Sequence, residues 1–326
     1  MSNNSSRWLV AIAAGAACGS ASAVERPIAV YNQGALARAF ELPVLGETGV
    51  LPNGDSTGAL RFDLTTEYHT SGDPAGEAVL LDGESDLLTF AFRRGLGLGI
   101  EMTLEIPVLY QGGGFMDGPV EDWHSIFGLP NGGREDAPQD RLLYQYQRAN
   151  GQTVLNYDRK GADLADIRLG VGWQAAESLA LRTELKLPTG DDAHLAGGNF
   201  GGALWADWAL PIPDSLWLSG WVSAGGSYNG DNGLLDDQQQ SFVPFGGLGL
   251  SARLGENWAL LGQLYAHGKL YDDSSLDPFR EGLQGSLGLR YHVGNVLDVD
   301  LGFQEDLITS SSPDFSVHLA LGWRSK

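Results

Sequence analysis

The chain has little cysteine, few basic residues and no long apolar run, and each shortage excludes a class of protein. Cys18 is the only cysteine among 326 residues, so the chain has no internal disulfide framework. No segment reaches the run of about 18 apolar residues that a transmembrane helix needs. The chain has 20 lysines and arginines against 41 acidic residues, and its formal net charge of −21 disfavours nucleic acid as a partner.

Glycine and aromatic residues, in contrast, are plentiful. The 46 glycines amount to about twice the usual share. Glycine costs about 1 kcal/mol relative to alanine inside a helix, whereas β-barrels tolerate it where strands bend or approach closely. The nine tryptophans and ten tyrosines are residue types enriched at membrane interfaces. This composition favours a β-rich protein associated with a membrane.

The N-terminal region has the pattern of a secretory signal peptide. Arg7 supplies a positive charge, residues 8–17 form a short apolar stretch, and Ala21-Ser22-Ala23 is an A-x-A cleavage site. We therefore predict a signal peptide over residues 1–23 and a mature chain that begins at Val24. Such a mature chain contains no cysteine.

An alternative interpretation makes Cys18 the modified cysteine of a lipoprotein. Gly15 then occupies the position three residues before it, where a leucine is expected. The A-x-A site is therefore the preferred interpretation.

After residue 57 apolar and polar residues alternate, which places one set on each face of a β-strand. Leu60, Phe62 and Leu64, for example, alternate with Arg61 and Asp63. Most of the segments have the length that a tilted transmembrane strand needs. The pattern predicts about twelve strands, at 58–69, 86–94, 98–110, 163–174, 179–188, 202–210, 216–228, 241–253, 258–269, 280–292, 296–307 and 314–324.

The connections between these segments alternate between long and short. Outer-membrane barrels have short periplasmic turns and longer extracellular loops, so both ends of the barrel are expected on the periplasmic side. We predict an all-β fold, a transmembrane antiparallel up-and-down β-barrel, over residues 58–326. Residues 24–57 precede it as a periplasmic or lumen-lining segment, or equally as a loose tail, and residues 111–162 form one long, helix-containing extracellular loop.

A soluble β-sandwich or lipocalin-like barrel shows the same alternation with its apolar face turned inward. The polar face here carries many charges, which suit a lumen better than a soluble core. The predicted signal peptide and the last segment, 314–324, which is amphipathic and aromatic, also favour a membrane barrel over a soluble one. One departure is that Trp323 is followed by three further residues, whereas barrel-assembly signals usually finish on an aromatic residue.

A set of motifs between residues 82 and 134 resembles an uncharacterised family of Gram-negative exported proteins, the domain-of-unknown-function 3187 family. The motifs are Asp82-Gly83-Glu84, Glu105-Ile106-Pro107, Gly112-Gly113-Gly114-Phe115-Met116-Asp117, Trp123-His124 and Phe127-Gly128-Leu129-Pro130-Asn131-Gly132-Gly133-Arg134. The resemblance implies an outer-membrane barrel. It implies no activity and no catalytic residue.

The 111–162 connection is too long to be only a link between strands. Val120, Trp123 and Phe127 fall on one face of a short helical pattern within it, next to His124. The face is expected to cover the barrel mouth or inner wall, either as a plug or gate or as a loop packed for stability. Arg134 is expected to reach inward toward Glu101 or Glu105.

Opposite charges on the polar faces predict a charge ladder inside the lumen. A three-residue link at 175–177 sets Asp166 opposite Lys186 and Arg168 opposite Glu184. A link at 293–295 sets Arg290 opposite Asp298 by the same rule.

No catalytic, cofactor or metal site is predicted. His124 and Ser125 are adjacent on the expected helix and do not face each other, and the chain has no G-x-S-x-G elbow. The six histidines form no H-E-x-x-H pair. Acidic loops around Asp236 and Asp272 are expected to be solvated, with weak calcium binding as the alternative.

The leading hypothesis is a narrow passive or gated channel for small solutes in the outer membrane of a Gram-negative bacterium. A structural or surface-interaction barrel with a closed lumen is the alternative, and a lipid-modifying enzyme comes third. Expected partners are outer-membrane lipids, lipopolysaccharide, the barrel-assembly machinery and a small solute that the sequence does not identify.

Overall fold

The structure is a computed structural model that describes residues 24–128, 132–213, 216–231, 233–307 and 311–325. The predicted signal peptide at 1–23 lies outside the described residues. None of the helices in these ranges is long and apolar enough to cross a bilayer.

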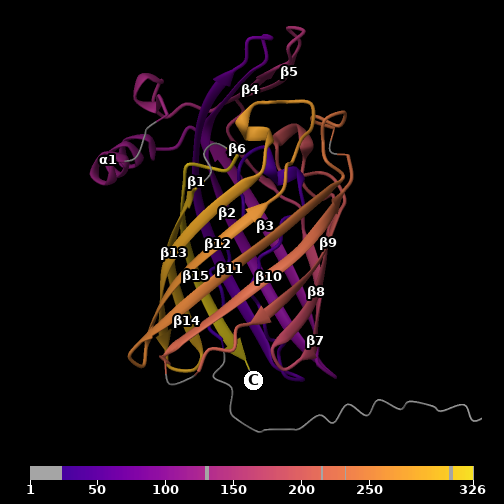
Figure 1. The fold of residues 1–326 in the computed structure, drawn as a ribbon, viewed down its shortest axis with the longest axis vertical. Coiled ribbons are helices and arrows are strands. Elements are labelled where there is room, and N and C mark those ends of the chain that lie inside the picture. The colour runs from indigo at the N-terminus through magenta and orange to yellow at the C-terminus, as the bar shows by residue number, and fades with distance from the viewer. Residues whose placement is uncertain (1–23, 129–131, 214–215, 232, 308–310, 326) are drawn as a thin grey trace, which may run out of the picture.

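Twelve of the described strands form a closed antiparallel barrel, as the sequence predicts (Figure 1). Each strand pairs with the next, and β15 pairs with β1 to complete the circle. The strands are β1 (Ser56–Gly72), β2 (Ala78–Gly97), β3 (Ile100–Gly112), β7 (Arg168–Ala176), β8 (Leu179–Lys186), β9 (Gly201–Ala209), β10 (Leu218–Asn229), β11 (Phe242–Leu254), β12 (Trp258–His267), β13 (Gly282–Val293), β14 (Leu297–Asp306) and β15 (Phe315–Ser325). All twelve predicted segments are strands.

The long connection after β3 contains most of the remaining elements. The hairpin of β4 (Leu143–Gln147) and β5 (Thr153–Tyr157) pairs with the upper part of β2 and rises above the barrel rim, while β6 (Gly161–Leu164) pairs with β3 above β7 (Figure 1). The same connection holds helix α1 (Asp117–Phe127) and the 3-10 helix η2 (Arg134–Asp136). Three further 3-10 helices are η1 (Ala37–Ala39), η3 (Asp192–His194) and η5 (Asp277–Phe279).

The strands place apolar side chains on the outer face of the barrel and polar side chains on the inner face, as a membrane barrel requires. On β1, Leu60 and Phe62 are 44% and 36% exposed on the outer surface, whereas Asp63 is buried inside. Exposed leucine, valine and aromatic side chains continue around the other strands and form an apolar belt. The end of the barrel with the short links corresponds to the predicted periplasmic side, and the end with the long loops to the extracellular side.

Two predicted strand registers are wrong by two residues. In the β7–β8 hairpin Arg168 lies opposite Lys186, because Ala176 pairs with Leu179 across a two-residue turn and a bulge follows at Gln174. Because the turn is shorter and lies later than predicted, every residue pair between β7 and β8 is shifted.

The β13–β14 hairpin shows the same shift for a different reason. Val293 joins the strand and pairs with Leu297, so the three-residue link is 294–296 rather than 293–295. Arg290 therefore lies opposite Asp300, and His292 lies opposite Asp298.

Residues 24–55, called the luminal segment below, lie inside the barrel and supply much of its core. Ile28, Leu36, Phe40 and Leu42 are each 3% exposed or less. Leu36, Phe40 and Leu42 belong to a buried apolar cluster that also includes wall residues such as Trp205. Of the alternatives that the sequence left open, the contacts of this segment place it in the lumen.

Candidate functional site

The rising half of the luminal segment follows the inner wall from the periplasmic mouth to the extracellular end. Near the mouth Arg26 contacts Asp298 at 2.5 Å. Farther up, the backbone N–H of Ile28 donates to Gln263, and the carbonyl of Ile28 accepts from the same side chain at 2.9 Å. At the extracellular end the amide of Asn32 contacts His267 at 2.8 Å. Each of these contacts is made to a wall side chain.

The descending half returns to the mouth along the opposite wall. The N–H of Glu41 donates to Asn229 at 2.6 Å, near the extracellular end of β10. Farther down, the N–H of Gly46 donates to Asp207 at 2.9 Å. The N–H of Leu51 donates to Glu101 at 2.9 Å, just above the turn between β2 and β3. The segment is thus a re-entrant loop whose two ends both lie at the periplasmic mouth.

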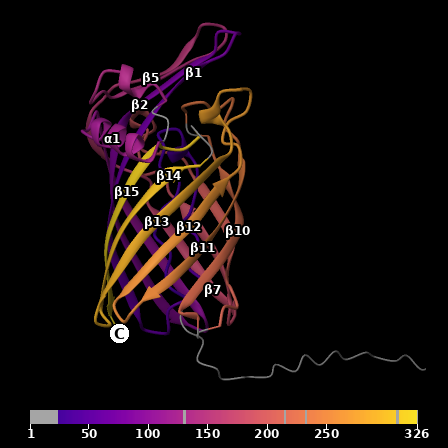
Figure 2. The same ribbon diagram turned by 60° about the vertical axis from the view of Figure 1, so that its left-hand side comes forward.

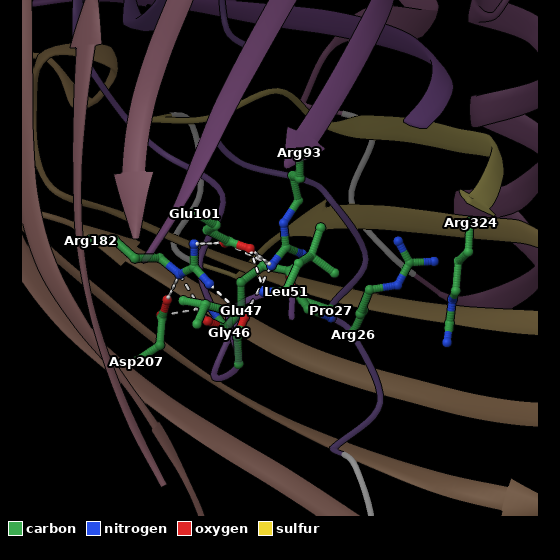
Figure 3. A network of polar contacts seen from close by, with 12 residues as sticks. Arg26, Pro27, Gly46, Glu47, Leu51, Arg93, Glu101, Arg182, Asp207 and Arg324 are labelled. Atoms are coloured by element: carbon green, nitrogen blue, oxygen red, sulfur yellow. Dashed lines mark hydrogen bonds and ion pairs between the residues drawn. The ribbon is translucent and has the colours of Figure 1, made fainter. Parts of the chain in front are cut away.

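A network of arginines and carboxylates holds the lower part of the descending half (Figure 3). Arg182 contacts Glu101 at 2.6 Å and Asp207 at 3.0 Å. It also donates to the carbonyls of Glu47 and Gly49, both at 2.8 Å. One wall side chain therefore bonds two carboxylates of the wall and two backbone carbonyls of the luminal segment.

Arg93 extends this network to the side chain of the luminal segment. It pairs with Glu101 at 2.8 Å and with the carboxylate of Glu47 (Figure 3). Burial raises the pKa of Glu47, but the charges of Arg93, Arg26 and Arg182 outweigh burial and bring the pKa down to about 2. Glu47 is therefore ionised at neutral pH and paired to the wall.

A second set of buried charges surrounds the top of the descending half. The carboxylate of Glu41 is fully buried and lies 3.7 Å from the guanidinium of Arg168, which also stacks 4.6 Å from the ring centre of Tyr31. Lys186 donates to Asp166 at 2.7 Å and to Asn199 at 2.6 Å. The contacts of Arg168 join the luminal segment to β7.

The residues of the predicted charge ladder are all buried inside the barrel, but only one of the predicted partnerships forms. Lys186 does contact Asp166, although Asp166 lies just before β7 and not directly opposite. Arg168 contacts Glu41 instead of Glu184, and Arg290 pairs with Asp300 at 2.6 Å. The lost pairings follow from the two-residue register shifts described above.

Asp298 has different partners from the one expected. It accepts from Arg26 and His292 at 2.5 and 2.7 Å, and from Arg324 at 3.2 Å. Sequence reasoning also missed the contacts of Glu41 and Glu47, because their segment shows no periodicity that would assign them to a face.

The barrel interior is roomy at one end and tightly filled higher up. A cavity of about 720 Å³ opens at the periplasmic mouth. Deeper in the barrel, cavities of about 40 and 50 Å³ lie between the luminal segment and the wall. The mouth cavity is lined by residues that include Arg26, Arg93, Arg253, Trp258, His292 and Arg324.

Helix α1 lies on the outer surface of the barrel and not over the mouth, so the expectation that it plugs the lumen is wrong (Figures 1 and 2). Val120 is 1% exposed and packs in a cluster with Phe315. The ring of Trp123 packs edge-on against Phe303 and at a tilt against Phe127 and Phe315. The apolar face covers the outer wall because outward-facing aromatic residues of β14 and β15 are available there.

Arg134 also binds away from its predicted partners. It donates to Asp117, to Thr66 at 3.0 Å and to Asp314 at 2.5 Å, all outside the lumen. Its predicted partner Glu105 pairs with Arg61 at 2.7 Å, and Glu101 belongs to the Arg182 network. His124 is buried on α1 beside this cluster.

In the part of the chain that the structure describes, no group of three histidine, cysteine or carboxylate side chains has an arrangement suited to a metal ion.

The fold is similar to that of solved outer-membrane proteins. The COG4313 outer membrane channel from Pseudomonas putida F1 superposes with a TM-score of 0.56 at 13% identity, over 86% of this chain and 98% of that chain. The translocator domain of the autotransporter NalP from Neisseria meningitidis gives 0.46 at 12% identity, over 84% and 90%. The toluene transporter TbuX from Ralstonia pickettii gives 0.40 at 10% identity, over 90% and 98%.

No curated protein matches the sequence. One family model does, and it spans nearly the whole chain. The model described as a protein of unknown function, DUF3187, matches residues 8–325. The resemblance carried by the motifs between residues 82 and 134 is thereby confirmed, and the chain belongs to the DUF3187 family.

Proposed function

We propose that this protein is a gated outer-membrane channel for small solutes and that the luminal segment is its gate. The observation that carries the proposal is the path of residues 24–55. Both ends of the segment lie at the periplasmic mouth, and within the described residues no strand of the barrel includes any part of it. The segment can therefore leave the lumen while every strand keeps its two neighbours.

The size of the barrel supports a channel that opens only when its contents move. Barrels of about eight strands are filled by their own side chains, whereas those with about 16 leave an aqueous pore. This barrel has twelve strands, and a chain segment occupies the space that their side chains leave. Removing that segment leaves a lumen lined by charged and amide side chains.

The charge of the chain bears on the solute. The whole chain carries 41 acidic against 20 basic residues. A protein with this acidic excess attracts cations and repels anions, so cations and neutral solutes are expected to pass in preference to anions. The similar protein from Pseudomonas putida is an outer membrane channel, which agrees with this class of function.

A structural barrel with a permanently closed lumen is the second candidate, and a specific observation favours it. Leu36, Phe40 and Leu42 of the luminal segment pack in one apolar cluster with wall residues, and such burial stabilises the closed state. The two candidate functions differ in whether the luminal segment ever leaves the lumen.

Deletion of residues 24–54 from the mature chain distinguishes the candidates. The intact and shortened proteins are compared in planar bilayers, with heat-dependent gel mobility as the check that each has folded. A gate predicts rare opening of the intact protein and steady conductance of the shortened one. A folded shortened barrel that does not conduct contradicts the channel proposal and leaves the structural one.

A disulfide tether tests the same point without removing any residue. A Cβ atom at Gly201 would lie 2.9 Å from the Cβ of Glu41, which is shorter than the spacing of about 3.8 Å in disulfides, so the luminal segment must move slightly away from the wall for the bond to form. The double variant Glu41→Cys/Gly201→Cys is expected to stay closed when oxidised and to open on reduction. The single variant Gly201→Cys is the control, and it is expected to show no redox response.

A further inference from the structure

Helix α1 lies against the outside of the barrel at the extracellular edge of the apolar belt. It is held at its N-terminal end. Glu84 accepts from the N–H of Phe115 at 2.8 Å and from that of Met116, just before the helix begins. Arg134 binds Asp117 in its first turn. The position of the helix relative to the wall is therefore fixed.

Only some of the apolar residues of α1 lie on the side that packs against the wall, and others stay exposed. Ile126 is 75% exposed and Phe127 is 60% exposed, and Phe115 just before the helix is 66% exposed. Pro119 and Ile126 are seven residues apart and so share one flank of the helix. Asp117 and His124, also seven apart, share the opposite flank.

The contacts of Arg134 show which flank faces the extracellular side. Arg134 connects Asp117 to Thr66 and lies 5.5 Å from the ring centre of Tyr68. Both of these β1 residues are closer to the extracellular end than Leu64, against which the helix packs. The polar flank is therefore directed to the extracellular side.

The opposite flank, which carries Ile126, then faces the apolar belt. The next outward-facing residues below the helix are Phe62, Leu301 and Leu319, which are 36%, 55% and 44% exposed. The apolar flank of α1 and the belt form one continuous surface.

We propose that α1 is an interfacial helix that binds the acyl chains of the outer leaflet through Phe115, Ile126 and Phe127. Helices with one apolar and one polar flank lie in the plane of the interface and bury the apolar flank among acyl chains. Lipid is the occupant because the surface continues the belt that lipid already covers. Trp123 fits this placement, since its ring N–H donates to Glu305 at 2.7 Å while its ring packs on the wall.

Single-cysteine labelling tests the placement, because Cys18 lies in the predicted signal peptide and the mature chain has no other cysteine. Ser125 and Ile126 are both exposed neighbours, but they point about 100° apart around the helix. Variants Ile126→Cys and Ser125→Cys are each labelled with a nitrobenzoxadiazole dye and reconstituted into phosphatidylcholine vesicles. A fraction of the lipid carries a spin label in its acyl chains.

The label at Ile126 is expected to show blue-shifted emission and several-fold stronger quenching by the spin-labelled chains than the label at Ser125. Equal, weak quenching at both positions would place the helix in water and overturn the proposal. Shielding at Ile126 that appears only at high protein-to-lipid ratio would identify a second copy of the chain as the occupant, which also overturns it. Heat-dependent gel mobility confirms that both labelled barrels are folded.

Discussion

The guanidinium of Arg290 donates two hydrogen bonds to the carboxylate of Asp300, at 2.7 and 2.6 Å, directly across from it on the neighbouring strand. Its remaining N–H groups donate to the carbonyls of Arg26 and Pro27, at 2.8 and 3.2 Å. A pair of wall residues thus also fixes the place where the luminal segment enters the barrel.

Replacement of Arg290 by methionine is expected to destabilise the folded barrel by about 3 to 5 kcal/mol, because it leaves the carboxylate of Asp300 without its partner. Arg290→Lys should restore only part of the loss, since lysine cannot make the two parallel bonds. The free energies of unfolding of the two variants are measured by urea unfolding in lipid vesicles, with tryptophan fluorescence as the signal. Equal stability of the methionine variant and the intact protein would contradict this account.

Acidification is expected to loosen the descending half of the luminal segment. The pKa of Glu47 is about 2, below its ordinary value of 4.5, so its ion pair stabilises the docked segment fully above pH 4.5. This contribution is lost as the pH falls from 4.5 through 2, when the carboxylate becomes protonated. Channel opening should therefore increase across this window, as measured by conductance at a series of pH values.

The variant Glu47→Gln is the control for this pH response. It has no carboxylate to protonate, so its opening frequency should be high already at pH 7 and should change less between pH 4.5 and 2. An unchanged response in the variant would assign the acid effect to other groups.

Replacement of Arg182 by glutamine is expected to raise the opening frequency at neutral pH, because it removes two bonds to backbone carbonyls of the luminal segment. Hydrogen bonds from a charged donor contribute about 1.5 to 3 kcal/mol each, so losing two of them should lower the ratio of closed to open protein by roughly a hundredfold or more. Arg253→Gln is the matched control, since Arg253 is an exposed residue at the mouth. Similar behaviour of the two variants would argue against a specific role for Arg182.

Deletion of residues 117–127 is expected to leave conductance unchanged, because α1 covers the outer wall and not the lumen. The same deletion should weaken the attachment of the 111–162 loop, which Arg134 and Asp117 join to the rim. Limited proteolysis of the reconstituted protein should then cut this loop faster. An increase in conductance would mean that the helix does occlude the pore.

Strand positions and faces could be predicted from the sequence because alternation is a local property. Leu60, Phe62 and Leu64 report their own orientation, and each strand contributes such evidence independently. Register depends on the turn, and a three-residue link that begins one residue later moves every pair along the ladder by two. For this reason Arg168 and Arg290 were assigned to the correct face but to the wrong partners.

The lumen contents could not be predicted because the luminal segment has neither helical nor strand periodicity. Glu41 and Glu47 form ion pairs with wall residues more than 40 positions away, Arg168 and Arg93 respectively. The helical pattern of α1 was visible, but both surfaces of a membrane barrel can accept an apolar stripe. Its location was decided by Phe303 and Phe315, which no local pattern connects to Trp123.

The pairing of β1 with β15 has a consequence for the order of assembly. The seam joins the first and last of the barrel strands, and the luminal segment leads directly into β1. The segment is synthesised before any strand, whereas the seam can form only after β15 exists. The segment is therefore already tethered beside the seam when the wall closes, so the lumen can be filled as the barrel is completed.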